Sequence, residues 1–345
     1  MNLHGREGFL NLLKLLIGLL LLAVMGGQYY LVSKGDNTGY AELGSKHIIA
    51  VKPGMSTGDI ATLLHEKKLV QDPTNFRWEA RMKGLATKLQ AGIYVIEGGW
   101  SNSQIVNTMA KGRIKLVQFT VPEGYNVVKT AQKLESFEMG SAAKFMEAAK
   151  NYAPYAYMET EDPNVIFKAE GFLYPATYEI PWGTSEEEIL AILVRGFNTA
   201  MEESGVLKTV EERQLQLRDV VNLAAMVELE AVYPEEQPRI AGVFTKRLAI
   251  DMPIQSDTTI QYILGAQKEL ITFKDTEIQN PYNTYQNYGL PPGPIASPSL
   301  NAIKAVLTPE ENDYLYFVAE PDGHHRFTNT YSQHLQAIND IDNGR

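Results

Sequence analysis

The sequence predicts an α+β protein with a single N-terminal transmembrane helix, a small α/β module and a larger mixed α+β domain. Three observations predict this architecture. An uncharged run extends from Leu15 to Val32. Short strand and helix patterns alternate over residues 47–115, and longer helical patterns followed by a Pro-, Gly- and Asn-rich region occupy residues 116–345. A chain of 345 residues is long enough to form more than one hydrophobic core.

The composition argues against several classes of function. The formal net charge of −10 argues against a nucleic-acid partner, because phosphate binding requires a basic surface. The absence of cysteine excludes disulfides, thiol catalysis and a thiolate metal site. It also excludes a lipidated N-terminal cysteine, so attachment to a membrane would require a helix.

Residues 9–32 predict that helix, because their apolar run approaches the roughly 20 residues that cross a hydrocarbon layer. Tyr29 and Tyr30 lie where an interfacial aromatic belt is expected. The alternative is a signal peptide cleaved near Gly26-Gly27-Gln28. The short tail of residues 1–8 is expected to be cytoplasmic and the large C-terminal body extracytoplasmic. The predicted location is therefore the cell membrane, with a single crossing.

A polar stalk (residues 33–46) is expected to join the anchor to the small module (47–115). Within this module we expect strands at HIIAVKPG and AGIYVIEGG, and helices after Ser56, around residues 75–82 and at SNSQIVNTMAKG. Residues 54–58 match the nucleophile pattern G-x-S-x-G. The spacing of Ser56 and Asp59 instead indicates a helix N-cap with an acidic third residue.

The larger domain (116–345) is expected to begin with a strand, a turn and a helix. Helical patterns follow at residues 139–160, Ser185–Ser204, Glu211–Ala231 and Pro234–Ala249. From Asp251 onward the composition predicts short strands and long loops.

The stretch AAMVELEA places two carboxylates in an otherwise apolar helical run. At 100° per residue, Glu228 and Glu230 fall on opposite shoulders of the apolar arc, and the far side is apolar as well. Burial without a cation raises a carboxyl pKa, as a general acid near neutral pH requires. The alternative is a structural ion pair with Arg239 or Arg247. We expect one glutamate to be functional and one structural, and periodicity does not decide which.

Two polar segments downstream are further candidates. MPIQSDTTIQY predicts a loop that presents Gln255 and Asp257, although a solvated turn explains it equally well. Residues 280–299 contain five prolines, three tyrosines and three asparagines, which exclude a helix or a central strand. This composition suits a carbohydrate cleft; a rigid spacer is the alternative. The spacing of His324, His325 and His334 fits no common zinc signature, so histidines lining a cleft are expected.

Several of these motifs together carry a family resemblance. They are the glutamate pair in MVELE, then VFTKRL, MPIQSDTT, PYNTYQNYGLPPGPIASP, YLYFVAEPDGHHRF and SQH, with EGFLYPATY upstream. With these motifs the chain resembles the endolytic murein transglycosylases of the YceG-like family. The resemblance runs from the anchor to the C-terminus, and residues 47–115 look like a LysM sugar-binding module.

The resemblance implies a membrane-anchored enzyme that cleaves peptidoglycan strands between N-acetylmuramic acid (MurNAc) and N-acetylglucosamine (GlcNAc), leaving 1,6-anhydro ends. It assigns catalysis to Glu230, the second glutamate of the pair, and structural support to Glu228 and Arg247. It implies no cofactor or metal, with glycan strands and peptidoglycan synthases (penicillin-binding proteins) as partners. The residues that match its substrate-binding motifs are Gln255, Asp257, Tyr282, Asn283, Tyr285 and His325.

The chain departs from the family pattern at three positions. Thr258 occupies a position where proline is usual, Lys246 replaces an asparagine, and Glu236-Gln237 stands where Glu-Arg is expected. Two other functions remain open. One is a muramidase that hydrolyses the same bond with Asp257 as its second carboxylate. The other is a non-catalytic peptidoglycan-binding scaffold that uses residues 47–115 as its reader.

Overall fold

The computed structural model describes residues 39–52, 54–112, 116–266, 268 and 270–344, together with Lys14 and residues 16–20. The predicted tail (1–8), most of the predicted anchor (9–32) and the start of the predicted stalk lie outside the described residues. Among the residues that are described, no helix combines the length and apolar character needed to cross a membrane.

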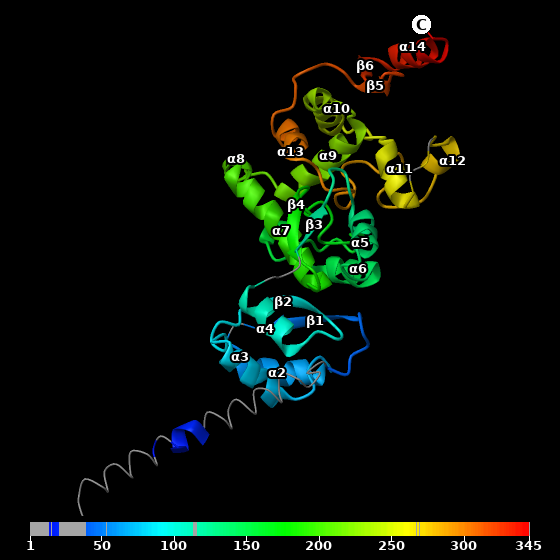
Figure 1. The fold of residues 1–345 in the computed structure, drawn as a ribbon. Coiled ribbons are helices and arrows are strands. Elements are labelled where there is room, and N and C mark those ends of the chain that lie inside the picture. Colours follow the sequence, from blue (N-terminus) through cyan, green and yellow to red (C-terminus); the bar gives the residue numbers. More distant parts are fainter. Residues whose placement is uncertain are drawn as a thin grey trace, which may run out of the picture. The chain divides into compact units, whose positions relative to one another are not determined.

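The chain forms two compact units, and the architecture is mixed α+β (Figure 1). The described part of the first unit ends at Val117 and also includes Pro181–Gly183. The second unit contains Gln118–Ile180 and continues from Thr184 to the C-terminal end.

The first unit is built on an antiparallel pair, β1 (Lys46–Val51) and β2 (Gly92–Glu97), in which Ile49 lies opposite Tyr94. Three helices complete it: α2 (Thr57–Glu66), α3 (Pro73–Met82) and α4 (Asn102–Ala110). The strands and helices predicted for this module are therefore confirmed. Their apolar faces share one core that includes Ile49, Ile60, Leu64, Phe76, Tyr94 and Ile105.

The G-x-S-x-G match in this unit is a helix cap. Ser56 is the N-cap of α2: its hydroxyl accepts from Asp59 N, while Asp59 Oδ2 accepts from Ser56 N at 2.8 Å. This reciprocal capping box satisfies donors that are otherwise unpaired at a helix start. The cap interpretation is confirmed.

Strand β3 (Leu116–Thr120) leads along the chain into the second unit and pairs with β4 (Thr177–Pro181). Between them lie α5 (Val127–Ser136), α6 (Ala142–Asn151) and the short 3₁₀ helix η1 (Ala156–Met158). After β4 come α7 (Glu186–Glu203) and α8 (Val206–Glu212), with α7 packed against α6. α7 agrees with the predicted helix, and Ser185 caps it with Glu188.

The helix predicted over Glu211–Ala231 is shorter than expected. Residue 214 has a left-handed φ of 55°, and the N–H of Leu215 bonds back to the carbonyl of Val210. This closure ends α8, and α9 begins afresh at Leu217 and extends to Glu230. Helical periodicity continues across such a break, which is why it was not predicted.

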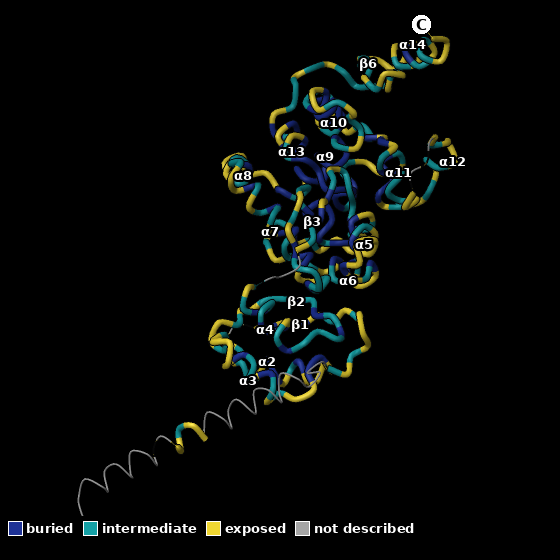
Figure 2. Tube along the Cα trace, in the orientation of Figure 1, coloured by how far each residue is buried: buried dark blue, intermediate teal, exposed yellow. Residues whose placement is uncertain are grey.

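α9 is the central helix of the second unit, and it packs against α10 (Gln237–Ala249), α11 (Asp257–Leu264) and α13 (Leu300–Leu307). Its residues from Val220 to Val227 are all buried, which confirms that protein surrounds this helix. Figure 2 shows the same concentration of buried residues around α9.

The short strands and long loops predicted after Asp251 are present, but this region also contains helices that were not predicted. This region contains α11, α12 (Phe273–Thr276), α13 and α14 (Tyr331–Asp342), and one hairpin of β5 (Tyr316–Ala319) and β6 (His325–Thr328). The helices are short, and all four have a polar N-cap residue: Ser256, Thr272, Ser299 or Thr330. Such residues are typical of both turns and N-caps, so composition alone favoured loops.

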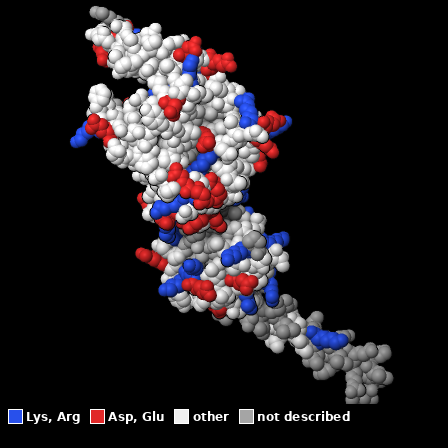
Figure 3. All heavy atoms as spheres, turned by 180° about the vertical axis from the view of Figure 1, so that it is seen from behind, with Lys and Arg blue, Asp and Glu red and all other residues white. Residues whose placement is uncertain are grey.

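The surface of the described residues carries charges of both signs. On the face in Figure 3, lysine and arginine side chains lie singly or in small groups among acidic and uncharged ones.

Candidate active site

Glu230 is the last residue of α9. The residue keeps partial solvent access, while protein surrounds its carboxyl group. Desolvation is the largest influence on it and raises the pKa of Glu230 to about 7. The negative end of the helix dipole acts in the same direction, because it also disfavours a carboxylate. Glu230 is therefore available as a proton donor near neutral pH.

Two donors from the start of α11 hold this carboxyl group. Ser256 Oγ donates to Glu230 Oε1 at 2.5 Å, and the backbone N–H of Thr258 also donates to it. Thr258 Oγ1 lies 2.5 Å from Ser256 Oγ and extends the network by one hydroxyl. These hydrogen bonds lower the pKa of Glu230, so they moderate the effect of burial.

Asp257 brings a second carboxylate close to Glu230. Its negative charge raises the pKa of Glu230, while the cation of Arg247 lowers it. Asp257 is exposed, and its Oδ1 accepts a 2.6 Å hydrogen bond from Tyr285 Oη. Burial and the bond to Asp257 both raise the pKa of Tyr285, so this phenol stays protonated. The structure thus brings together three residues predicted for the site: Glu230, Asp257 and Tyr285.

A threonine of the PYNTY segment holds the chain beside Glu230 in place. Thr284 Oγ1 accepts from Ser256 N at 3.1 Å and lies 3.0 Å from Thr259 Oγ1. The carbonyl of Thr284 accepts from Gln255 N at 3.1 Å. Sequence reasoning did not select Ser256 or Thr284, although both lie inside motifs that it singled out. Each lies next to a residue that was selected, and this proximity in the sequence is the signal that could have identified them.

Gln255 lies just before this segment and is exposed. Its φ of 52° is in the left-handed region, which is uncommon for a residue with a side chain. The predicted loop ends here, because Ser256 is the N-cap of α11 and Asp257 is its first residue. Gln255 is therefore presented to solvent on a strained turn beside the catalytic candidate.

A cavity of about 540 Å³ adjoins these residues. Leu229, Asp257 and Thr258 line it from the Glu230 side, and residues of α5 and of the rest of α11 line it elsewhere. Its walls are mainly apolar. Volume and lining are typical of a ligand site, where a few polar groups orient a molecule inside an apolar cleft.

Glu228 faces a different environment. Its Oε2 accepts from Ser299 N at 3.0 Å, from Ser299 Oγ at 2.5 Å and from Gln237 Nε2 at 3.4 Å. Ser299 is the N-cap of α13, so the carboxylate lies at the positive end of that helix. This geometry favours the structural role predicted for Glu228.

Arg247 is buried and binds backbone carbonyl groups. Its guanidinium donates to the carbonyls of Leu315 at 2.6 Å and Ile254 at 2.7 Å, and it stacks 5.1 Å from the ring of Tyr316. It thereby ties α10 to the chain before α11 and to the hairpin strand β5. Among the described residues, no ion pair joins Arg239 or Arg247 to either glutamate of the MVELE pair.

Two residues predicted to bind substrate lie inside the protein. Tyr282 is 2% exposed and packs against the ring of Tyr262 at 5.1 Å. Asn283 is fully buried, with Nδ2 donating to the carbonyls of Thr276 and Ile278 at 3.0 and 2.8 Å. Its Oδ1 accepts from Tyr285 N at 2.9 Å. Both residues hold the PYNTY loop in this conformation, and their contact with a sugar remains a prediction.

His325 is bound to Glu236. Its Nδ1 lies 2.8 Å from Glu236 Oε2, its backbone N–H donates to Oε1 at 3.1 Å, and its side chain is 4% exposed. The pair joins the β5–β6 hairpin to η2 (Pro234–Glu236) just after α9. His324 stacks on Tyr233, and His334 stacks on a tyrosine of β5. A sugar contact by His325 remains a prediction.

The residues at the three positions that depart from the family pattern each make a defined contact. Thr258 supplies an N–H to Glu230 that a proline would lack. Lys246 pairs with Asp313 at 2.5 Å. Gln237 donates to Glu228.

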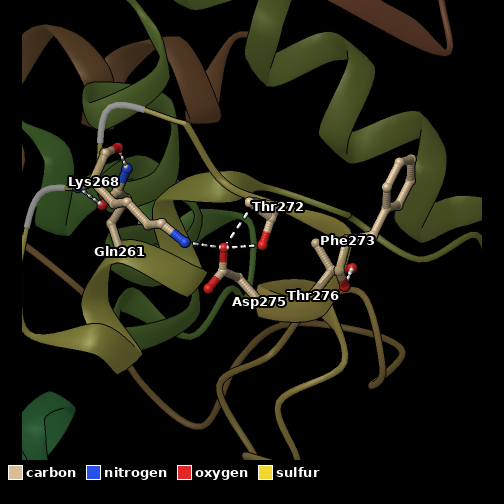
Figure 4. Close-up of polar contacts among 6 residues, drawn as sticks. All are labelled: Gln261, Lys268, Thr272, Phe273, Asp275 and Thr276. Atoms are coloured by element: carbon tan, nitrogen blue, oxygen red, sulfur yellow. Dashed lines mark hydrogen bonds and ion pairs between the residues drawn. The ribbon is translucent and has the colours of Figure 1, made fainter.

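The segment after α11 carries its own polar network (Figure 4). Gln261 on α11 bonds to both backbone groups of Lys268, at 2.7 and 2.6 Å. The ammonium of Lys268 pairs with Asp275, which also accepts from Thr272 N at 2.7 Å. The side chain of Phe273 points away from this network and is 91% exposed. These contacts tie α12 to α11.

The arrangement can carry out acid catalysis on a glycoside. It has a carboxyl group with a pKa of about 7, a neighbouring carboxylate and a cavity beside them. Glu230, rather than Glu228, has the environment that this chemistry requires.

The chain is similar to a known family and to several known proteins. The YceG-like family matches residues 49–340. An endolytic murein transglycosylase from Bacillus subtilis (strain 168) is 30% identical over 303 residues, with 84% of this chain and 83% of the relative covered. One from Streptococcus pneumoniae (serotype 2, strain D39) is 30% identical over 314 residues, covering 83% of this chain but 56% of the longer relative.

A solved structure is also similar. The crystal structure of a protein from Listeria monocytogenes described as yceG-like shares 29% sequence identity with this chain. The match covers 85% of this chain and 99% of that one, with a TM-score of 0.60. The family match spans most of the chain and includes both glutamates and the cavity. The chain therefore belongs to the YceG-like family.

Proposed function

We propose that this protein is a membrane-anchored endolytic lytic transglycosylase of peptidoglycan. It cleaves the β-1,4 bond between MurNAc and GlcNAc within nascent glycan strands and leaves 1,6-anhydroMurNAc ends. The observation that carries the proposal is the Glu230 carboxyl, whose pKa is raised to about 7 beside a cavity of about 540 Å³. Relatives named endolytic murein transglycosylase support it.

One carboxyl group is sufficient for this reaction. Neutral Glu230 gives its proton to the glycosidic oxygen as the bond from muramyl C1 to that oxygen breaks, which frees the GlcNAc 4-hydroxyl. The C6 hydroxyl of the same muramyl residue then attacks C1 and returns its proton to the Glu230 carboxylate. The ring closes as the 1,6-anhydro sugar, no water is consumed, and Glu230 is restored. The intramolecular attack supplies the nucleophile at high effective concentration.

The residues around Glu230 can assist both steps of the reaction, proton donation and ring closure. Ser256 Oγ and the Thr258 N–H stabilise the carboxylate that remains after proton transfer. The negative charge of Asp257 stabilises the positive charge that develops at C1. Gln255 and Tyr285, at the same site, orient the sugar through its hydroxyl and acetamido groups.

Asp257 is also the observation that favours the alternative muramidase. A hydrolase needs a second carboxylate as base or nucleophile, and Asp257 is close enough to raise the pKa of Glu230. The two reactions differ in their products. Hydrolysis leaves reducing ends, whereas transglycosylation leaves anhydro ends.

The setting of the enzyme forms part of the proposal. The apolar run within residues 9–32 anchors it in the cell membrane, with both units outside the cytoplasm. There it meets glycan strands as peptidoglycan synthases of the penicillin-binding class release them, and cutting them sets strand length during wall assembly. The small module, residues 47–115, contributes glycan contacts.

The decisive experiment compares wild type with Glu230→Gln on uncrosslinked glycan strands, with products identified by mass spectrometry. We expect wild type to release anhydro-terminated fragments and E230Q to lose the activity by about 10²-fold to 10⁴-fold. Asp257→Asn is the companion variant, because a muramidase would depend on it as strongly as on Glu230. Reducing-end products from wild type would establish the hydrolase. Unchanged strand length in cells carrying E230Q would instead favour a non-catalytic scaffold.

A further inference from the structure

Glu170 is a buried carboxylic acid that the proposed reaction does not use. The residue is 1% exposed and lies in the EGFLYP segment between η1 and β4. Its Oε1 accepts from Val127 N at 2.9 Å, its Oε2 from Tyr262 Oη at 3.2 Å, and it also accepts from Gly171 N. Among the described residues no ion pair reaches it. Burial raises the pKa of Glu170 to about 8.

The partners of Glu170 belong to the elements that line the cavity beside Glu230. Val127 is the first residue of α5, and its neighbours Asn126 and Val128 line the cavity. Tyr262 lies on α11 and lines the cavity itself. The segment that carries Glu170 contributes Phe167 to the same lining. Three lining segments therefore meet at one buried side chain.

α11 is also the element that holds Glu230. Its N-cap, Ser256, donates to Glu230 Oε1, and the N–H of Thr258 in its first turn donates to the same carboxyl group. A small displacement of α11 would lengthen both hydrogen bonds. The hydroxyl of Tyr262, one turn along, is the point at which Glu170 holds this helix.

We propose that Glu170 is a positioning residue that fixes α5 and α11 around the cavity and so maintains the hydrogen bonds of Ser256 and Thr258 to Glu230. The role rests on the proposed catalytic function of Glu230. If Glu170 only packed, its substitution would lower stability and leave the pKa of Glu230 unchanged. If it positions α11, its substitution also changes the pKa of Glu230.

The substitutions can separate these two roles. Tyr262→Phe removes only the bond from α11 to Glu170. Glu170→Ala removes the bonds to both helices. Glu170→Gln keeps the shape, and its amide oxygen accepts from Val127 N while its NH₂ donates to Tyr262 Oη. Tyr157→Phe is the matched control, because it removes a part-buried tyrosine hydroxyl bond, 3.1 Å to Asn198, in the same unit but away from the cavity.

The first measurement is the pH dependence of anhydro-product release by the full-length protein, per folded molecule. Loss of the Ser256 and Thr258 bonds raises the pKa of Glu230, so in Y262F and E170A the alkaline limb should move to higher pH. We also expect kcat to fall about 10-fold to 100-fold in Y262F and E170A, because α11 is displaced in both variants. E170Q and Y157F should keep the wild-type profile. The other charged groups acting on Glu230, Asp257 and Arg247, are unchanged in these variants.

The second measurement follows the Glu230 carboxyl carbon by NMR titration in the same proteins, with E230Q used to assign its signal. It requires no catalysis, so it tests the positioning role even if wild type releases no anhydro products and the proposed function fails. A raised Glu230 pKa in Y262F and E170A, restored in E170Q, is the expected result. A wild-type Glu230 pKa in Y262F and E170A, with only the melting temperature lowered, would overturn the inference. An equal shift of the Glu230 pKa in E170Q and E170A would also overturn it.

Discussion

Ser256 Oγ donates a 2.5 Å hydrogen bond to Glu230 Oε1, although the two residues are 26 positions apart in the sequence. The bond joins the N-cap of α11 to the last residue of α9. It opposes desolvation, and the balance leaves the pKa of Glu230 at about 7. A contact between two helices thus moderates the proton affinity that burial gives the catalytic candidate.

Removing this hydroxyl should change the pH profile. Burial keeps the pKa of Glu230 high and the Ser256 bond lowers it, so in Ser256→Ala the pKa rises further. The acid then stays protonated to higher pH, and the alkaline limb of activity should move up by roughly one to two pH units. Profiles of anhydro-product release against pH provide the check. Ser297→Ala is the control, since Ser297 is buried and its hydroxyl has no partner among the described residues.

Glu228 should matter for stability more than for turnover. Glu228→Ala leaves the buried N–H and hydroxyl of Ser299 at the start of α13 without their acceptor. We expect the free energy of unfolding to fall by roughly 1.5–3 kcal/mol, the usual contribution of hydrogen bonds to a charged group. Urea unfolding of the full-length protein measures it, with Glu211→Ala, an exposed glutamate on α8, as the control. An E228A protein as stable as wild type would contradict the structural assignment.

The His325–Glu236 contact should stabilise the protein in a pH-dependent way. Desolvation raises the pKa of Glu236, but the contacts with His325 and His324 together outweigh it and hold this pKa below its ordinary value of 4.5. A depressed folded-state pKa contributes stability above the unfolded pKa and loses it as the pH falls through the folded one. His325→Gln should therefore lower the melting temperature at pH 7, and the difference should shrink below about pH 4.

His324→Gln serves as the comparison for that series, because the distance from His324 Nδ1 to Glu236 Oε1 is longer, 3.5 Å, and its side chain is 46% exposed. Its effect should be smaller. The same two variants test the predicted sugar contact: if His325 binds substrate, H325Q should also raise KM, and H324Q should leave KM unchanged.

Substitution of Gln255 can separate the effect of backbone strain from a role in substrate binding. Gln255 and Asp251 have nearly the same left-handed φ, 52° and 53°, in one loop. Glycine relieves the strain at either position but is more flexible when unfolded, so each substitution should raise the free energy of unfolding by at most about 1 kcal/mol. Only Gln255→Gly removes a predicted sugar contact. Cleavage should fall in Q255G and not in Asp251→Gly, and equal rates would exclude a binding role for the Gln255 side chain.

The sequence by itself determined the elements whose signals are local. Apolar periodicity and caps predicted the strands and helices of the first unit, and they predicted that protein surrounds α9. They did not predict the short helices after Asp251, because residues such as Ser299 and Thr330 are common both in turns and at helix starts. Motifs selected the segments that contain Gln255, Asp257 and Tyr285, and the structure brings Asp257 and Tyr285 close to Glu230.

Only the tertiary structure decided how the two glutamates differ. They are two residues apart on one helix, so the sequence gives them almost the same local environment. Glu228 meets the N-cap of α13, where donors and the helix dipole stabilise a carboxylate. Glu230 meets Ser256 and Asp257, beside residues that line a cavity, and desolvation there keeps its proton. A carboxyl pKa depends on the groups that surround it in space, and residues distant in the sequence supply those groups.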